Sequence, residues 1–428
     1  MSFINIKTKN FSFYLKRFLP LFLILFLIWW RINTICELPK PTGSYSVGTT
    51  LYHFKDFKRL ESHLVDKKEP RELLVQIWYP SDEKIELKSP YIFDILPVLR
   101  DSARNTCSYY LPRVLFDYFL TGIVTHSIPE ATLSCKQQKF PVLIFSHGFA
   151  SLSNFNTTQL EELASHGYVV VGINHTYDCS VTVFPDGRII PLSNDWEIGE
   201  IRYLENSIND WIKDTIFVLD ELEKLNNSDV KKKFNNHLDL SKIGMFGHSM
   251  GGATTAQICR LDSRVKAGIS MDGPLFGKDS KKAFNKPFMF ILAEESLKMT
   301  KRDLTKSELN YRKMTREDEQ VIKKIFSKDI PELCHNIGKN AYYIVMKGAE
   351  HYTFCDFPLF RSFSLFFRYF NFGFGSIEPI KAIKIINACI LDFFNTVLLH
   401  KKSCLIKKEN ICPEIEIKRG DCLALNKF

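Results

Sequence analysis

The 11 cysteines of the sequence include no Cys-X-X-Cys pair, which argues against a structural zinc site. Internal repeats and low-complexity tracts are also lacking. The 57 lysines and arginines outnumber the 48 aspartates and glutamates, which gives a net charge of +9. The basic residues are scattered and form no basic stripe. The sequence therefore argues against a zinc module, a repeat array and a nucleic-acid-binding protein. The positive charge is compatible with an anionic lipid surface, or simply with a solvated basic surface.

The N-terminus lacks an apolar run long enough to cross a bilayer comfortably. Residues 18–30 are apolar and lie between Arg17 and Arg31, with further lysines upstream. A basic region followed by a short apolar run is typical of an export signal, and a full span needs ~20 residues. No A-x-A-like cleavage site follows, and Trp29 and Trp30 suit a membrane interface. We expect an uncleaved signal-anchor, with a cleaved signal peptide and a secreted or periplasmic body as the alternative.

Strand-like and helix-like stretches alternate through the rest of the 428 residues. Such alternation predicts an α/β fold, with a mostly parallel sheet covered by helices on both faces. The pattern of residues 71–80 alternates apolar with polar, as a half-exposed strand does. Strands are further expected at residues 140–148, 168–174, 265–271, 287–293 and 341–347, and helices at 158–166, 201–225 and 382–399.

The chain divides by composition into three parts. Residues 1–35 form the targeting segment, residues 36–400 the catalytic domain, and residues 401–428 a tail with little pattern. Two insertions are expected in the domain, an aromatic, helical one at about 91–135 and a charged one at 298–335. The odd number of cysteines leaves at least one unpaired within the chain, and the tail offers three candidates for disulfides, Cys404, Cys412 and Cys422.

The stretch around Ser249 organises the rest of the chain. A strand-like run from Ile243 leads into Gly247-His248-Ser249-Met250-Gly251, and a helix-like run follows. Strand, G-x-S-x-G and helix together predict a nucleophile elbow, in which a sharp turn lifts the serine hydroxyl off the end of a sheet. The alternative is a glycine-rich turn with an inert serine.

A serine hydroxyl needs a base, and the base needs an orienting acid. In this architecture the order is serine, acid, histidine, each after a different strand. Asp272 follows one predicted strand and His351 lies in the loop after another, so we expect Ser249, Asp272 and His351 to form the triad. Rival acids and histidines were also present in the sequence: Glu294, Glu295, His335 and His248.

The tetrahedral intermediate of ester hydrolysis needs two backbone donors for its oxyanion. One is expected to be the N–H of Met250, directly after the nucleophile. The other is expected from the loop after the earlier strand, Ser146-His147-Gly148-Phe149, and we choose the N–H of Phe149.

With these residues in place, the sequence resembles the plasma or secreted platelet-activating factor acetylhydrolases and their bacterial relatives. The resemblance runs from about residue 41 to residue 399. It is carried by residues 41–49, 75–80, 145–148, 163–168, 184–188, 247–252, 271–273 and 351–354. The charged residues 298–329, the tail and the N-terminus depart from that pattern.

The resemblance implies an α/β-hydrolase fold and a calcium-independent serine esterase that needs no cofactor and no metal. It also implies Ser249, Asp272 and His351 as the triad, and a phospholipid substrate cleaved at the second glycerol position. Residues 361–375 are rich in phenylalanine and suit an acyl-pocket wall, a membrane-dipping segment or ordinary core packing. The alternatives are a broader esterase, similar to cutinases or dienelactone hydrolases, and a binding module without activity.

Overall fold

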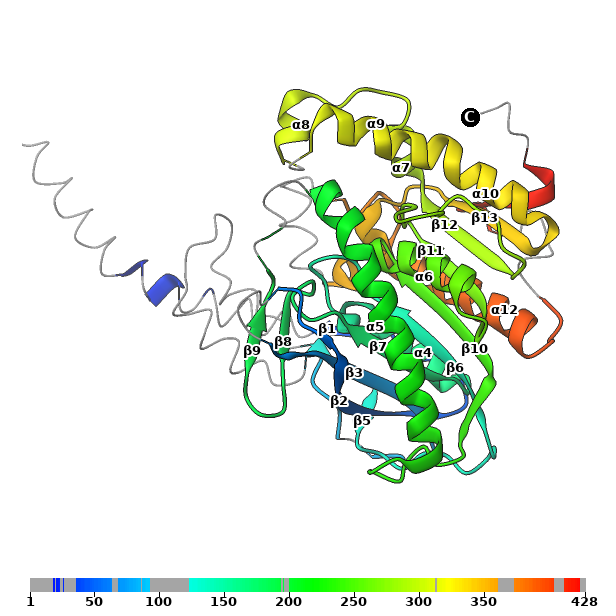
Figure 1. Cartoon of the computed structure of the whole chain (residues 1–428). Coiled ribbons are helices and arrows are strands. Elements are labelled where there is room, and N and C mark those ends of the chain that lie inside the picture. Colours follow the sequence, from blue (N-terminus) through cyan, green and yellow to red (C-terminus); the bar gives the residue numbers. More distant parts are fainter. Residues whose placement is uncertain are drawn as a thin grey trace, which may run out of the picture.

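The computed structural model describes residues 36–63, 68–85, 87–92, 123–193, 195, 200–311, 314–360, 373–403 and 412–423, with a few positions between 18 and 26. One mixed sheet organises this part of the chain (Figure 1). Its strands lie in the order β14 (Ile415–Arg419), β13 (Ala341–Met346), β12 (Phe288–Ala293), β11 (Val265–Met271), β10 (Leu238–His248), β6 (Phe140–Ser146), β7 (Val169–Asn174), β3 (Pro70–Ser81), β2 (Ser46–Leu60) and β5 (Ser127–Pro129).

The central strands from β7 to β13 run parallel, while β3 joins β7 and β14 joins β13 in antiparallel fashion. Every residue of β6 and β7 is buried, as expected for parallel strands with both faces covered. The parallel strands therefore deliver their carboxyl ends, and the loops that follow, to one edge of the sheet.

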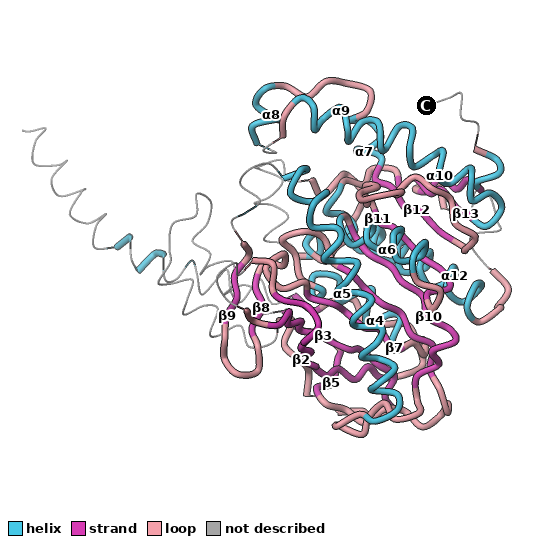
Figure 2. The backbone as a smooth tube through the Cα atoms, viewed as in Figure 1, coloured by secondary structure: helices cyan, strands magenta, loops and turns pink. Residues whose placement is uncertain are grey.

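Helices cover both faces of this sheet (Figure 2). One face packs against α5 (Glu200–Ser228), α6 (Met250–Leu261) and α10 (Ile330–Ile337). The other face packs against α4 (Thr157–Ser165) and α12 (Pro379–Leu398). This layering is the α/β-hydrolase fold that the sequence predicted. The long helix α5 crosses the front of the sheet in Figure 1.

The remaining elements are short. Two small sheets pair β1 (Cys36–Glu37) with β4 (Ile123–Val124) and β8 (Val181–Val183) with β9 (Ile189–Pro191). The other helical segments are η1 (Ser153–Asn156), α7 (Glu294–Met299), α8 (Lys306–Tyr311), α9 (Arg316–Lys324), η3 (Ile325–Asp329), η4 (Gly338–Asn340), η5 (His351–Phe354), η6 (Phe357–Leu359) and η7 (Gly420–Cys422).

Strand β3 differs from the sequence expectation of a half-exposed strand. All of its residues after Pro70 are buried, because β2 and β7 flank it and helices cover it. Its polar side chains are satisfied inside the protein: Gln76, for example, donates to Thr49 and accepts from Asn154. Both faces of β3 are therefore buried, and polar residues of the strand are hydrogen-bonded inside the protein.

The structure also describes parts of the two predicted insertions and of the predicted tail. The described part of residues 91–135 contains β4 and β5 and no helix, while residues 93–122 lie outside the described part. The described part of residues 298–335 contains the end of α7, then α8, α9, η3 and most of α10, and α10 packs into the core. The tail, which showed little pattern, supplies the edge strand β14. Cys412 and Cys422 are free thiols, and Cys404 lies outside the described residues.

Within the described part of the chain, no helix combines the length and the apolar character that crossing a bilayer requires. The signal-anchor expectation concerns residues 1–35, of which only a few positions are described. The phenylalanine-rich segment likewise falls mainly outside the described residues, since 361–372 are not among them.

Candidate active site

Ser249 lies at a sharp turn between β10 and α6. Its backbone has φ 54° and ψ −119°, a conformation that residues with a side chain rarely adopt and that costs about 1–3 kcal/mol. Two backbone hydrogen bonds hold it: Ser249 N donates to Met271 O at 2.9 Å, and Ala253 N donates to Ser249 O at 3.1 Å. The surrounding fold thus maintains a strained turn at the residue that the sequence singled out.

Two glycines let other segments approach this turn. A Cβ on Gly251 would lie 1.9 Å from the carbonyl oxygen of Ser146, so the start of α6 is pressed against the end of β6. A Cβ on Gly148 would lie 3.3 Å from Cβ of Ser249. The loop after β6 therefore lies directly beside the serine, and neither glycine has room for a side chain without local movement.

Asp272 and His351 meet at the same edge of the sheet. Asp272 follows β11 and is buried, and its Oδ2 lies 2.7 Å from Nδ1 of His351. The carboxylate also accepts hydrogen bonds from Ala293 N at 3.0 Å and from Ser296 Oγ at 2.9 Å. Burial acts to raise the pKa of Asp272, but the hydrogen bond and charge of His351, helped by those two donors, lower the pKa below its usual value.

The tautomer of His351 follows from that contact. An ionised carboxylate facing Nδ1 favours the form in which Nδ1 carries the proton, which leaves Nε2 as the proton acceptor. The side chain of His351 is 39% exposed, whereas that of Asp272 is fully buried. The buried carboxylate therefore orients the imidazole from its Nδ1 side, and the exposed part of the ring stays accessible, as a general base requires.

His248, considered in the sequence as a rival histidine, contacts the backbone of His351. Its Nε2 lies 2.9 Å from the carbonyl oxygen of His351, and the two rings are 4.6 Å apart. Burial and the proximity of His351 lower the pKa of His248 to about 3, so the ring is neutral and donates this bond. The elbow and the loop of the base are thereby tied together.

The other rivals have different surroundings. Glu294 accepts the backbone N–H of Gly348 at 2.9 Å and pairs with Lys298 at 3.1 Å. The backbone N–H of Glu295 donates to Ala349 O at 3.2 Å. His335 is an exposed residue on α10. Glu294 and Glu295 thus shape the turn before His351, while Asp272 is the carboxylate that contacts its ring.

The expected oxyanion donors belong to the two segments that flank the serine. Met250 is the first residue of α6, and Phe149 follows Gly148 in the loop after β6. The approach of Gly148 to Ser249 brings that loop to the nucleophile. The roles of both N–H groups stay predictions.

A buried carboxyl group that the sequence analysis did not identify, that of Asp356, lies behind the loop of His351. Asp356 follows η5 and accepts hydrogen bonds from the hydroxyls of Thr158 and, at 3.1 Å, Tyr91. Its backbone N–H donates to Phe155 O at 2.7 Å. Burial raises the pKa of Asp356 to about 8 despite these donors, and nearby Glu161 adds to the effect. Asp356 thus joins the His351 loop to the start of α4.

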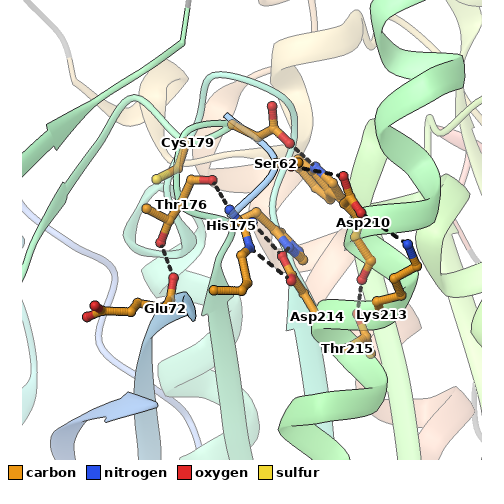
Figure 3. A network of polar contacts seen from close by, with 12 residues as sticks. Ser62, Glu72, His175, Thr176, Cys179, Asp210, Lys213, Asp214 and Thr215 are labelled. Carbon is orange, nitrogen blue, oxygen red and sulfur yellow. Dashed lines mark hydrogen bonds and ion pairs between the residues drawn. The ribbon is translucent and has the colours of Figure 1, made fainter. Parts of the chain in front are cut away.

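A polar network was also missed, and Figure 3 shows part of it. His175, just after β7, faces Asp214 of α5, with Nδ1 and Oδ2 3.0 Å apart. Arg71 of β3 binds the same carboxylate at 2.7 and 3.1 Å. All three side chains are buried. A sequence signal existed, since Arg71 opens a strand and Asp214 lies on the apolar face of a helix, but only the fold brings them together.

Potential metal ligands do not gather in the same way. Across the residues that the structure describes, no group of three or more histidine, cysteine, aspartate and glutamate side chains could hold a metal ion.

Known proteins are similar to this chain over most of its length. The sequence model of the family described as platelet-activating factor acetylhydrolase, isoform II, matches residues 31–198 and 211–410. Platelet-activating factor acetylhydrolases of Cavia porcellus and Canis lupus familiaris are 24% and 25% identical, each over 89% of this chain and over 84% and 83% of their own lengths.

Two further matches are a relative that aligns over a shorter part of the chain and a protein of solved structure. A probable 1-alkyl-2-acetylglycerophosphocholine esterase of Arthroderma benhamiae is 24% identical, over 56% of this chain and 59% of its own length. A solved ferulic acid esterase of Streptomyces cinnamoneus superposes with a TM-score of 0.66 at 24% identity, over 90% of this chain and 99% of that one. The last likeness concerns the fold. Because the family match covers most of the sequence, this chain belongs to the platelet-activating factor acetylhydrolase isoform II family.

Proposed function

We propose that this protein is a serine carboxylic-ester hydrolase that removes the acyl group from the second glycerol position of a phospholipid. Ser249 is the nucleophile, His351 the general base and Asp272 the orienting acid. The observation that carries the proposal is the 2.7 Å contact between Asp272 and Nδ1 of His351, at the sheet edge that also carries the strained turn of Ser249. Family membership supports the same chemistry.

In the first half of the reaction, Nε2 of His351 takes the proton of the Ser249 hydroxyl as its oxygen attacks the ester carbonyl. Asp272 stabilises the imidazolium that forms, without taking the proton itself. The N–H groups of Phe149 and Met250 donate to the oxyanion, and losing one such donor costs about 3 kcal/mol of transition-state stabilisation. His351 then protonates the leaving alcohol, which departs and leaves an acyl group on Ser249.

In the second half, a water molecule replaces the alcohol. His351 removes its proton as it attacks the acyl-enzyme, the same donors stabilise the second oxyanion, and Ser249 leaves with the proton returned by His351. Each step uses groups of this chain and water alone. No step requires a metal ion or cofactor.

The substrate class follows from the family and from the names of its relatives. Several are named platelet-activating factor acetylhydrolase, and one is named as a probable esterase of an alkyl-acetyl-glycerophosphocholine. We therefore propose a phospholipid with a short or oxidised acyl group, met at a membrane surface. The alternative is a broader esterase that accepts unrelated acyl esters.

A comparison of acyl lengths tests this proposal. Full-length protein is assayed on phosphatidylcholines with acetyl, butyryl, hexanoyl and palmitoyl groups at the second position, and on short nitrophenyl esters, with and without a metal chelator. We expect preferred cleavage of short acyl groups, no effect of chelation, and at least 10³-fold loss in Ser249→Ala. Equal activity of Ser249→Ala and wild type would sink the mechanism. Activity on nitrophenyl esters without any on phospholipids would favour the broader esterase.

We also propose the domain division and the location. The hydrolase body begins at about residue 36 and extends beyond residue 400 to include β14, and the basic and apolar segment in residues 1–35 directs it out of the cytoplasm, as a cleaved signal or as an anchor. N-terminal sequencing of protein recovered from the medium and from membranes separates these two forms. A body retained in the cytoplasm with an intact N-terminus would contradict export.

A further inference from the structure

The loop that supplies Phe149 is anchored by a histidine that the proposed reaction does not use. His147 is completely buried, and its Nδ1 lies 2.6 Å from the carbonyl oxygen of Gly148. That carbonyl belongs to the same peptide unit as the N–H of Phe149. In a trans peptide the C=O and N–H point in opposite directions, so whatever holds the carbonyl of Gly148 also aims the N–H of Phe149.

The proton on His147 can be assigned from its second nitrogen. The backbone N–H of His175 donates to Nε2 of His147 at 3.2 Å, so Nε2 is an acceptor. The neutral ring must then carry its proton on Nδ1 and donate it to Gly148 O. Burial, with the nearby His175, lowers the pKa of His147 to about 3, which keeps this neutral form at physiological pH.

His175 is in turn held on three sides. Its Nδ1 faces the carboxylate of Asp214 at 3.0 Å, and its Nε2 lies 3.0 Å from Oγ of Ser146. Its ring stacks on Trp211 with centroids 3.9 Å apart. Figure 3 shows His175 and Asp214 facing each other between the sheet and α5. Burial acts to raise the pKa of Asp214, but the charge and hydrogen bonds of Arg71 and the bond from His175 lower it well below the usual range.

Two hydrogen bonds from backbone N–H groups after Gly148 also hold this loop. Ser151 N donates to Gly148 O at 3.1 Å, and Ala150 N donates to Asp178 O at 2.9 Å. The side chain of Asp178 accepts a hydrogen bond from Trp211 at 2.7 Å. The loop is therefore fixed to the same helix, α5, that carries Asp214.

We propose that His147 is a positioning residue, which orients the Gly148–Phe149 peptide as an oxyanion donor. It is itself held by the backbone N–H of His175, whose ring is in turn held by Asp214. The inference rests on the proposed esterase function and deepens it. Ser146, His175 and Asp214 repeat the hydrogen-bond order of a catalytic triad, but Ser146 is completely buried, so this second set supports the site and does not react.

The test compares His147→Leu with His147→Asn in the full-length protein. Leucine fills a similar space without a donor, whereas the amide nitrogen of asparagine is as many bonds from the backbone as Nδ1 and can still reach Gly148 O. Both are assayed on a short nitrophenyl ester, and inhibition is measured with a trifluoromethyl ketone, which forms an oxyanion on the serine. Circular dichroism and thermal unfolding establish that each variant is folded.

We expect His147→Leu to lower kcat by about 10²-fold, the size of losing one oxyanion donor, with KM changed less than about threefold. Binding of the ketone should weaken by the same factor as kcat. His147→Asn should recover kcat to within about tenfold of wild type. Equal losses in the two variants, or an unchanged kcat in folded His147→Leu, would overturn the positioning role.

A milder pair covers the case in which the leucine variant does not fold. Ser146→Ala removes the hydroxyl that meets His175, while Ser153→Ala removes a buried hydroxyl that lacks a hydrogen-bond partner among the described residues. We expect kcat to fall several-fold in Ser146→Ala and to stay unchanged in Ser153→Ala; equal effects would contradict the proposal. An inactive wild type, or an active Ser249→Ala, would instead refute the esterase function itself.

Discussion

Asp356 makes the stability of this protein sensitive to alkaline pH. The carboxyl group is completely buried behind the loop of His351, and its pKa rises from 3.8 to about 8. Because the folded state holds the proton more tightly than the unfolded state, this group stabilises the fold fully below about pH 4. That contribution is lost as the pH rises to 8, where the folded protein must accept a buried charge.

The size of the effect can be worked out. A shift of about four pKa units, at about 1.4 kcal/mol per unit, sets an upper limit of about 6 kcal/mol on the loss between pH 4 and pH 8. Hydrogen bonds from Thr158 and Tyr91 and local relaxation reduce the cost of the charge. We therefore expect Asp356→Asn, which keeps the shape without the charge, to be more stable than wild type at pH 9 by about 2–3 kcal/mol.

Urea unfolding of the full-length protein at pH 5, 7 and 9 measures this difference. Other titrating groups contribute equally to both proteins, so the difference in unfolding free energy isolates Asp356. At pH 5, only about one unit above the unfolded-state pKa, little of this loss has occurred, so the two proteins should agree within about 1 kcal/mol. Asp303→Asn is the matched control, since its side chain is 77% exposed. A pH-independent difference between wild type and Asp356→Asn would refute the reasoning.

Three further predictions concern the site and its support. Asp272→Asn should lower kcat by about 10⁴-fold with little change in KM, because the amide favours the wrong tautomer of His351; a loss below tenfold would contradict its role. Gly251→Ala should yield little folded protein, since its Cβ would lie 1.9 Å from Ser146 O, and soluble expression with native circular dichroism would speak against that packing. Arg71→Leu should lower the free energy of unfolding by about 3 kcal/mol by leaving Asp214 short of a buried partner, whereas Lys282→Ala, which removes the surface pair of Lys282 and Asp279, should change that free energy far less.

The part of the site that could be predicted from sequence depends on local patterns. Ser249 was identifiable because a strand, two glycines and a helix follow one another directly. Asp272 and His351 were identifiable because each follows a strand, and parallel strands end at one edge. The contact between Asp272 and His351 arises from the order of β11, β12 and β13 in the sheet, which the fold family anticipates.

The features that could not be predicted depend on contacts between distant residues. The network of His175, Asp214 and Arg71 joins β7, α5 and β3, and each residue alone resembles an ordinary polar position. Strand β3 was expected to be half-exposed because its polar residues alternate with apolar ones. The fold buries those polar residues too. Alternation in the sequence cannot distinguish a strand face exposed to solvent from a buried face whose polar groups are hydrogen-bonded inside the protein.

Strand β14 has a consequence for how the protein is made. It pairs with β13 from Tyr342 to Met346 and follows every residue of the proposed triad in the sequence. During synthesis, the residues of the proposed triad therefore leave the ribosome before this strand does. Until then β13 presents an open row of backbone donors and acceptors, which is a template for pairing with another chain. We therefore expect a molecule that lacks β14 to be prone to self-association through the edge of β13.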